Sequence, residues 1–527
     1  MLILRVDLQK RASELIEDGL SRQEVLGGLG LTTTLLYRYT DRKIHSLAPA
    51  NHLFIAPGAF TGTNAPTASR SEASAISPAT GYFGTASSGG GFGAALRFAG
   101  LDAVWIEGAS EDPVYLTIDE GGTVAIKDAG ALWGLDSYQL LDVLKRKEGA
   151  QTEIACIGTA GERAVRCASI QNGYHHAFGR TGLGAVMGSK RLKAVCVRGT
   201  GSFKPYDSAR FAAAANRMRD KIMNSPTFGY TRRYGSLVMS DVYNRLGVLP
   251  AHNFRRGSLD DWQATRGRKA FEEGYKERDI ACFACPIGCM SWAKVKEGPW
   301  AGLETKALEV TFAIEFGAKL GLRSLPEIFA CGEACNRLGM DVISAASIAA
   351  FALELFEKGI ITTNDVGFEL KYGDFHSLYR LIHMIGTREG IGHILAEGIK
   401  RAKGIFKGSD EAAMEIKGLE IPVRDPRGRF DAWILGYLTN PRGGDHLRLR
   451  TPTDHMADGE RNYRYERLGL NPGEMEELDI PEAIRNQVFG NPPTRVHIAA
   501  MSKYAEELIV LFNSLGLCHR PPVLRTI

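Results

Sequence analysis

The hydrophobic pattern of the chain changes once, near residue 205, and this change limits the possible folds more than any other feature of the sequence. Before it, short segments rich in β-branched residues alternate with Gly, Ser and Pro, which is typical of strands joined by turns. After it, apolar residues recur with a period of about 3.6, which is typical of helices packed on a core. The expected strand segments are LILRVDL, LFIAPGAF, AVWIEG, VYLTID, TVAIKD, EIACIG, CASI and KAVCVRG.

We therefore predict an α+β fold, with a β-rich domain over 1–205, a helical domain over 206–405 and a second helical domain over 406–527. The last boundary is placed in the polar stretch GIKRAKGIFKGSDEA. No long amphipathic helix is expected between the strands, and no internal repeat with a fixed period is evident. The expected helices are ARFAAAANRMRDKIMNS, PEIFACGEACNRLGM, ISAASIAAFALELFEKG, HSLYRLIHMIG and VHIAAMSKYAEELIVLFNSLG.

The composition narrows the functional class. With 527 residues the chain is too long for a single core, and a net charge of +4 gives no reason to expect a nucleic-acid partner. The opening MLILRVDLQKR lacks the apolar centre of a signal peptide, and no apolar run is long enough to cross a bilayer. Nine cysteines are too sparse for a secreted disulfide scaffold. These features predict a cytoplasmic protein without membrane insertion.

The segment ACFACPIGCM places Cys282, Cys285 and Cys289 within eight positions. Pro286 and Gly288 prevent this segment from continuing as a helix. Three such close thiols suit zinc or an iron–sulfur cluster, and both need a fourth ligand. The spacing is the reverse of the CxxxCxxC that is usual in radical S-adenosylmethionine enzymes, so that class is set aside. The candidates for the fourth ligand are Cys518, the pair Cys331 and Cys335, or a histidine.

Two further patterns have two interpretations each. NRLGMD (336–341) and NSLGLC (513–518) look like twin ligand sites at helix ends, but Asn followed by Gly is equally a helix C-cap. The glycine-rich stretches SSGGGFG and FGRTGLGAVMGSK match neither GxxxxGK[ST] nor GxGxxG. They suit either turns or the close approach of backbone to a polyanionic cofactor.

The order of these and other segments carries a resemblance that covers nearly the whole chain. The segments are FTGTNAPTASR, SPATGYFGTASSGGGFGAALRFAGLDAVWIEG, YHHAFGRTGLGAVMGSKRLKAVCVRGT, ACFACPIGC, CNRLGMD, DPRG, TNPRGGDHLR and NSLGLC. Together they resemble the tungsten-containing aldehyde:ferredoxin oxidoreductase family. The resemblance implies a β-rich base and two helical domains that close over one tungsten or molybdenum, held by the dithiolenes of two pterins (molybdopterin). It also implies a nearby [4Fe–4S] cluster.

The resemblance implies specific ligands. Cys282, Cys285, Cys289 and Cys518 would hold the [4Fe–4S] cluster, and the backbone carbonyls of Ser87 and Ala177 would hold a Mg²⁺ between the pterin phosphates. Arg70 matches the arginine that links cluster and pterin, while Asn336 and Asn513 stand where the family has acidic residues. The residues implied to contact the pterins are Arg70, Ser87, Gly89, Gly90, Ala177, Gly179, Arg180, Asn336, Gly339, Met340, Asp341, His446, Arg448, Asn513, Gly516 and Leu517.

The resemblance also implies catalytic residues. The family associates proton transfer with a Glu after the cluster loop and with a His in an RGxxH segment, and His446 in PRGGDHLR matches that histidine. The family segment GPEYET overlies ALEVTF, so that Glu309 matches its first Glu and Thr311 its second. Because the second Glu is missing, we expect Glu309 or Glu304 to substitute for it.

Two further departures concern the assembly. Only nine residues follow Cys518, whereas family members usually continue much further, so we expect a shortened last domain whose pocket is open or covered by a partner subunit. A homo-oligomer is also compatible with the sequence. No Glu-x-x-His pattern near residue 330 supports the metal-linked dimer of some relatives.

The leading functional hypothesis is an enzyme that oxidises an aldehyde with water to a carboxylic acid and passes electrons to ferredoxin or a similar carrier. One alternative is the catalytic subunit of a tungsten-dependent benzoyl-CoA reductase-type complex, with Arg255, Arg256 and Arg268 as possible contacts for coenzyme A phosphates. The other alternative is an electron-relay or assembly subunit that has kept the cluster and lost the heavy metal.

Overall fold

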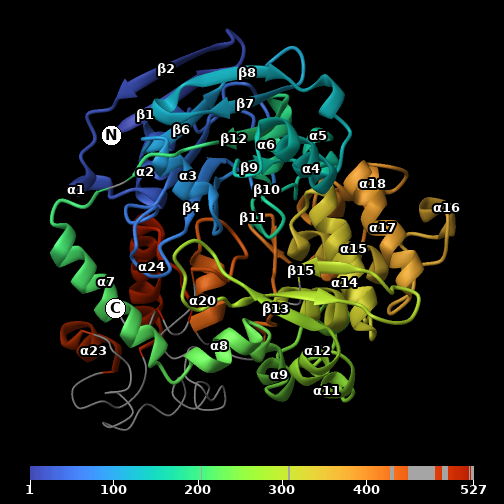
Figure 1. The fold of residues 1–527 in the computed structure, drawn as a ribbon. Helices are drawn as coiled ribbons and strands as arrows, with labels where there is room; N and C mark the ends of the chain where they lie inside the picture. The colour runs from blue at the N-terminus through green and yellow to red at the C-terminus, as the bar shows by residue number, and fades with distance from the viewer. Residues whose placement is uncertain are drawn as a thin grey trace.

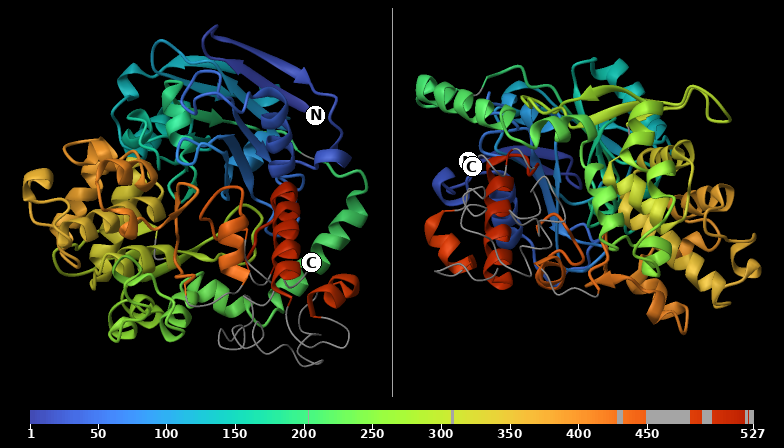
Figure 2. Two further views of the ribbon diagram at one scale, coloured as in Figure 1. Left: turned by 180° about the vertical axis from the view of Figure 1, so that it is seen from behind. Right: turned by 90° about the horizontal axis from the view of Figure 1, so that it is seen from below.

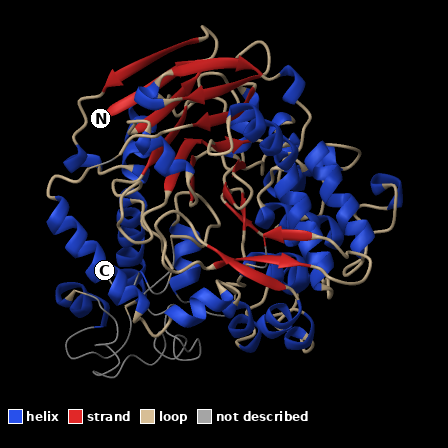
Figure 3. Ribbon diagram, in the orientation of Figure 1, coloured by secondary structure: helices blue, strands red, loops and turns tan. Residues whose placement is uncertain are grey.

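The computed structural model describes residues 1–202, 204–306, 309–427, 432–448, 481–489, 497–520 and 523. Its first part is rich in strands and the rest is mainly helical, which confirms the predicted α+β class (Figure 1, Figure 3). We call the β-rich part, residues 1–202, the base. None of the helices in the described ranges is both long and apolar enough to span a membrane.

The first half of the base is a six-stranded sheet with the order β2-β1-β6-β3-β4-β5. Only β1 and β6 pair in parallel, and the other neighbours are antiparallel. Helix α2 (Gly28–Tyr39) connects β2 to β3, and α3 (Phe92–Phe98) connects β5 to β6. The strands are β1 (Leu2–Asp7), β2 (Ala12–Glu17), β3 (Leu53–Pro57), β4 (Ser71–Ile76), β5 (Phe83–Ser88) and β6 (Ala103–Glu107).

The second half of the base repeats this topology strand for strand, in the order β8-β7-β12-β9-β10-β11. Again one pair, β7 and β12, is parallel and the others are antiparallel. Helices α4 (Ser137–Glu148) and α6 (Leu183–Ser189) take the places of α2 and α3. The strands are β7 (Val114–Ile118), β8 (Val124–Asp128), β9 (Glu153–Cys156), β10 (Ile170–Asn172), β11 (His176–Phe178) and β12 (Leu192–Val197).

The sequence carries a trace of this repeat, although it has no fixed period, and sequence analysis did not detect it. Residues 85–108 align without a gap with residues 176–199, and eight of the 24 positions are identical. Helices α3 and α6 begin at equivalent positions of this alignment, Phe92 and Leu183. The spacing differs elsewhere, since β3 begins at Leu53 and β9 at Glu153, and a search for one fixed period therefore fails.

Most predicted strands of the base are confirmed, but the helices between them were missed. Of CASI only Ile170 belongs to a strand. Helix α4 is amphipathic and 12 residues long, which contradicts the expectation that no such helix runs here. It begins where the Asp136 carboxylate accepts hydrogen bonds from the backbone N–H groups of Tyr138 and Gln139.

The five predicted helices after the base are confirmed as α7 (Ser208–Met223), α14 (Leu325–Leu338), α15 (Val342–Glu357), α17 (Phe375–Thr387) and α24 (Ile498–Leu515). The largest apolar core packs α14, α15 and α17 together, and a separate core lies between the two sheets of the base.

The second part also contains a small antiparallel sheet that was not predicted. The sequence KERDI of its first strand is too charged to indicate a strand. The three cysteines of ACFACPIGCM lie in the loop between its first two strands. We call residues 281–289 the cysteine loop. The strands are β13 (Lys276–Ile280), β14 (Met290–Lys294) and β15 (Glu304–Lys306).

The ends of α24 and α14 stand on equivalent loops of the base. Gly516 and Gly339 end these helices in the left-handed conformation, with φ of 83° and 76°. Gly516 lies against Gly58 after β3, where an added Cβ would be 2.2 Å from the Gly516 Cα. Gly339 lies against Gly158 after β9, where its own Cβ would be 2.7 Å from the Gly158 nitrogen. Backbone therefore meets backbone at both contacts.

We expect Gly58→Ala to destabilise the protein by about 1–3 kcal/mol, because its methyl group would overlap the backbone of Gly516. The midpoint of thermal unfolding, followed by circular dichroism, should fall below that of the wild type. Gly19→Ala is the matched control, since no atom lies within 4 Å of its added Cβ. A Gly58→Ala protein that unfolds at the wild-type temperature would show that the two backbones are not in tight contact.

Candidate functional site

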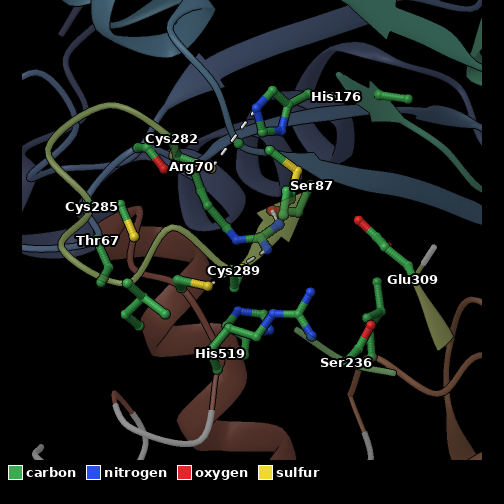
Figure 4. A pocket seen from close by; sticks show the side chains of 18 of the residues that line it. Thr67, Arg70, Ser87, His176, Ser236, Cys282, Cys285, Cys289, Glu309 and His519 are labelled. Atoms are coloured by element: carbon green, nitrogen blue, oxygen red, sulfur yellow. Dashed lines mark hydrogen bonds between the residues drawn. The ribbon is translucent and has the colours of Figure 1, made fainter. Parts of the chain in front are cut away.

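A cavity of about 220 Å³ lies where the base, the cysteine loop and the segment after α24 meet (Figure 4). Its walls come from parts of the chain that are far apart in sequence. The base contributes the residues before β4, the loop after β5 and strand β11. The remaining lining residues include Ser236, Lys306, Glu309, Val310, Thr311, His446, Leu447, His519 and Arg520.

Four cysteines line this cavity, Cys282, Cys285 and Cys289 of the cysteine loop and Cys518 after α24. The alternatives Cys331 and Cys335 are buried in the helical core and do not line it. Over the described ranges, no three His, Cys, Asp or Glu side chains converge on a single-ion site. The four separate thiols match an iron–sulfur cluster, which takes one cysteine per iron, better than one zinc ion.

Cationic groups stand beside two of these thiols. Burial raises the pKa of Cys285 to about 12 and also raises that of Cys289, so the thiolates need positive charge nearby. Arg70 Nη2 donates to Cys518 Sγ at 3.9 Å, and Arg520 hydrogen-bonds Cys289. Although burial opposes the charge of Arg520, Cys289 holds its pKa above the ordinary value. These arginines fit thiolates that are committed to a metal cluster.

Arg70 also reaches the base side of the cavity. Its Nη1 donates to Ser87 Oγ at 3.2 Å, and its buried Nε has no hydrogen-bond partner among the residues that the structure describes. In Figure 4 the three labelled cysteines, Cys282, Cys285 and Cys289, lie on one side of the cavity and Glu309 on the other, with the Arg70 guanidinium between them. This position suits a link between a cluster and a second bound group, as the resemblance implies.

The glycines of SSGGGFG make room for a histidine. A Cβ on Gly89 would lie 2.9 Å from Cys282 Sγ, and one on Gly90, whose φ is 91°, would lie 2.8 Å from the His176 ring. His176 Nε2 is 3.9 Å from Cys282 Sγ. Burial is the main cause that lowers the pKa of His176 to about 3, and the positive charge of Lys306 is the next. The glycines thus allow the base loop to approach both His176 and the cysteine loop.

The side chain of Arg448, two residues after His446, has the properties of a binding site for a phosphate-bearing cofactor. Arg448 is buried, and Nε and Nη2 of its side chain have no hydrogen-bond partner among the described residues. Burial and the neighbouring Arg442 lower the pKa of Arg448 to about 10. A buried, unpaired guanidinium is costly, and a phosphate would satisfy it.

Arg180 and Asp341 have protein partners instead. Arg180 donates to the carbonyls of Glu420 at 2.7 Å and Gly444 at 2.8 Å, and to the Asp341 carboxylate at 3.3 Å. Asp341 also accepts from the Ser344 N–H at 2.9 Å and caps α15. Neither residue lines the cavity. They join the base to two later segments of the chain, and their predicted pterin contacts stay predictions.

The two N-x-x-G motifs both end helices as C-caps, which confirms that interpretation. Asn513 Oδ1 is 2.5 Å from His519 Nε2, and the backbone carbonyl of Asn336 accepts from Ser137 Oγ at 2.8 Å. Asn513 is therefore tied to the segment that carries Cys518. A role in binding pterin stays a prediction for Asn336, Gly339, Met340, Asn513, Gly516 and Leu517, and also for Gly179, none of which lines the cavity.

Glu309 lies in the cavity wall and Glu304 does not. Glu309 precedes α13 (Val310–Phe312), and Lys306 Nζ is 3.3 Å from its Oε1. Lys306 lowers the pKa of Glu309 to about 2 in spite of burial, so the carboxylate is ionised. Glu304 is exposed on β15, 2.6 Å from Lys294, and we remove it from the catalytic set. Residues 307–308 of the ALEVTF segment lie outside the described residues.

His446 is buried in the same cavity wall. Its Nδ1 is 3.9 Å from Asp445 Oδ1. Burial opposes the ionisation of Asp445, but Arg442 and His446 hold its pKa below the ordinary value. The cavity thus combines an ionised carboxylate, three imidazoles and four thiols.

Sequence analysis missed several residues of the cavity, among them His176, Lys306, His519 and Arg520. Lys306 precedes Glu309 by three positions and Arg520 follows Cys518 by two. The signal that the sequence offered for Lys306 and Arg520 was a basic residue close to a predicted anionic residue. Their roles become visible only when the distances are known.

Comparison with known proteins finds matches to one family along nearly the whole chain. The family model "Aldehyde ferredoxin oxidoreductase, N-terminal domain" matches residues 3–199, and "Aldehyde ferredoxin oxidoreductase, domains 2 & 3" matches residues 213–526. The tungsten-containing aldehyde ferredoxin oxidoreductase of Thermococcus kodakarensis is 39% identical over 427 residues, which are 80% of this chain and 69% of that protein. Its namesake from Pyrococcus furiosus is 38% identical over 427 residues, with the same coverage.

Two further proteins are similar. The WOR-like subunit of the aliphatic sulfonate oxidoreductase of Pyrococcus furiosus is 31% identical over 485 residues, covering 84% of this chain and 74% of that protein. The solved active-site complex BamBC of benzoyl coenzyme A reductase with 1,5-dienoyl-CoA superposes with a TM-score of 0.84. It is 23% identical, with 99% of this chain and 82% of that chain covered, and therefore supports the fold alone.

The two family models together cover nearly every residue, and the identities are high enough to establish common descent. The chain therefore belongs to the aldehyde ferredoxin oxidoreductase family of oxidoreductase enzymes.

Proposed function

We propose that this enzyme oxidises an aldehyde with water to a carboxylic acid and passes the electrons through a [4Fe–4S] cluster to ferredoxin. The observation that carries the proposal is that four cysteines, Glu309 and His446 line one cavity. The relatives that share 38–39% of the aligned residues are named as tungsten-containing aldehyde ferredoxin oxidoreductases, which supports both the substrate class and the acceptor.

The cofactors in this proposal are a tungsten bis-pterin, a [4Fe–4S] cluster and Mg²⁺. Cys282, Cys285, Cys289 and Cys518 would hold the cluster. Arg448 would meet pterin phosphate, and the carbonyls of Ser87 and Ala177, which line the cavity, would hold Mg²⁺. When bound, the tungsten–dithiolene group would take two electrons from the substrate and the cluster would pass them on singly.

The chain's own residues would handle the protons. Oxidation of an aldehyde by water releases two protons and two electrons as the new C–O bond forms and the aldehyde C–H bond breaks. Glu309 is ionised and can accept a proton from the attacking water. The imidazole of His446 can bind the carbonyl oxygen and orient the aldehyde. Lys306 keeps Glu309 in the form of a base across the physiological pH range.

The residues available for the ring-reducing alternative are engaged elsewhere. Arg255 pairs with Glu357 at 2.7 Å and Arg268 with Asp241 at 3.3 Å, and neither these arginines nor Arg256 lines the cavity. The relay alternative gives no role to the ionised Glu309. Aldehyde oxidation accounts for more of the side chains at the site than either alternative.

The proposal is tested on protein purified without oxygen from tungstate-supplied cells. We expect about four iron atoms and one tungsten per chain, together with aldehyde-dependent reduction of benzyl viologen. Cys285→Ala should lose the iron and the cluster's electron paramagnetic resonance signal. Cys331→Ala, a buried cysteine away from the cavity, should keep both. Bound tungsten without turnover of any aldehyde would overturn the substrate class.

We expect Glu309→Gln to lower kcat for aldehyde oxidation by about 10²–10⁴-fold, because an amide cannot accept the proton. Glu304→Gln removes an exposed carboxylate from the same segment and should leave kcat within about twofold, since most surface substitutions are mild. The measurement is steady-state reduction of benzyl viologen, with tungsten and iron contents checked for each variant. Equal activities of the two variants would remove Glu309 from the mechanism.

Lys306→Met should make the activity sensitive to acid. Without the cation, burial raises the pKa of Glu309 from about 2 towards or above the usual value of about 4.3. Because the base must be ionised, kcat/KM should fall as the pH drops from about 6 to 4 in the variant, but not in the wild type. Lys294→Met removes the partner of Glu304 and serves as control. Superimposable profiles would contradict this role of Lys306.

A further inference from the structure

We propose that the outward face of α7 is the docking surface for a small acidic ferredoxin, which collects electrons from the cluster beneath this helix. The proposal rests on the proposed function for the presence of a cluster and for the direction of electron flow. We call the exposed residues Arg210, Arg217 and Lys221 of the helix, with Tyr206 just before it, the α7 face.

Helix α7 is unusually exposed for its length. Of its 16 residues only Ala215 and Ile222 are fully buried. Figure 2 shows the helix extended along the outside of the molecule, and in the right-hand view it projects beyond the neighbouring elements. An amphipathic helix in a globular protein normally buries a broader stripe. Most of the surface of α7 is therefore available to a partner.

The inner side of α7 covers the cysteine loop. Ile222 shares an apolar cluster with Ile287 of that loop, and Met218 packs against the same cluster. Cys285 and Cys289 pack against this cluster as well. An α-helix with its side chains is about 10–12 Å thick, so the outer surface of α7 lies about one helix diameter beyond the cluster that these cysteines contact. A carrier bound on α7 would therefore lie near the cysteine loop.

The outer side of α7 carries a stripe of positive charge. Arg210, Arg217 and Lys221 are spaced by seven and four positions and therefore project from one face of the helix. All three are exposed, and none forms an ion pair with any residue of the described ranges. Ala213 and Ala214 lie between them and leave the face flat. The stripe is about 16 Å long, since a helix rises by about 1.5 Å per residue.

Exposed apolar side chains lie at and beyond the two ends of α7. Tyr206 is fully exposed, and Met223 and Tyr230 are 48% and 54% exposed. These are three of the ten large hydrophobic residues that are exposed in the described part of the chain. Tyr, Met and Arg are enriched at protein–protein contacts, whereas Lys and Glu are depleted. The α7 face has the composition of a contact surface.

The charge of this region selects the partner. Residues 207–223 contain four basic side chains and two acidic ones, whereas the whole chain is nearly balanced at 64 and 60. Such a local field attracts an acidic protein and increases its rate of association. A second copy of this chain, docked symmetrically on the same face, would bring like charges together. The chemistry therefore favours an acidic electron carrier over self-association.

The test reverses the charge of two residues of the stripe. For the R210E/R217E holoenzyme we expect the KM for an acidic [4Fe–4S] ferredoxin to rise at least about tenfold, with a matching rise in the Kd measured by surface plasmon resonance. The increase of kcat/KM at low ionic strength should be lost. Activity with benzyl viologen should stay at the wild-type level, because this small dye needs no docking surface.

The matched control is K371E/K407E, which changes the net charge equally at two exposed lysines near α17 and α19 (Ile399–Ile405). The elements α16 (Thr363–Val366), α17 and α18 (Gly392–Leu395) lie at the opposite side of the molecule from α7 (Figure 1). A wild-type Kd for R210E/R217E, equal weakening in the control, or no binding of ferredoxin to the wild-type holoenzyme would overturn the proposal. Loss of viologen activity in the wild type would instead refute aldehyde oxidation, while the Kd still decides the docking surface.

Discussion

The contact between the end of α24 and the base determines the geometry of the whole site. Gly516 lies against Gly58, and the backbone N–H of Arg70 donates to the Gly516 carbonyl at 3.0 Å. Cys518 follows two residues later, so the same contact positions the fourth thiol relative to Arg70. Any side chain at these glycines would separate the two backbones. The twin contact of Gly339 with Gly158 fixes α14 on the other half of the base in the same way.

Within the cavity, three groups that can carry negative charge lie beside a cation. Arg70 contacts Cys518, Arg520 contacts Cys289 and Lys306 contacts Glu309. The direction of the pKa shift differs between these groups, because burial disfavours the charged form while the neighbouring cation favours it, and the balance is different at each group. For Glu309 the cation prevails and the pKa falls, whereas for Cys289 burial prevails and the pKa rises. The carboxylate is thus ionised in the free protein, whereas the Cys289 thiol keeps its proton there.

The sequence predicted the large features and missed those that depend on spatial proximity. The change from strands to helices, the five long helices and the link between the cysteine loop and NSLGLC followed from periodicity and motif order. The duplication of the base escaped because its two halves differ in loop length. The choice between Glu304 and Glu309 required burial, which one segment of sequence does not reveal. Lys306 and Arg520 likewise acquire meaning only through their neighbours in space.

The cysteine loop contacts both the cavity and the apolar cluster beneath α7. It lines the cavity, where under the proposed function Glu309 and His446 would meet the substrate. Cys285 and Cys289 also pack against an apolar cluster that includes Ile287 of the loop and Ile222 of α7. Of the residues of α7, only Ala215 and Ile222 are fully buried, so this helix adds a single thin layer over the cluster. Under the two proposals, the same short loop would therefore serve the substrate in the cavity and pass electrons towards α7.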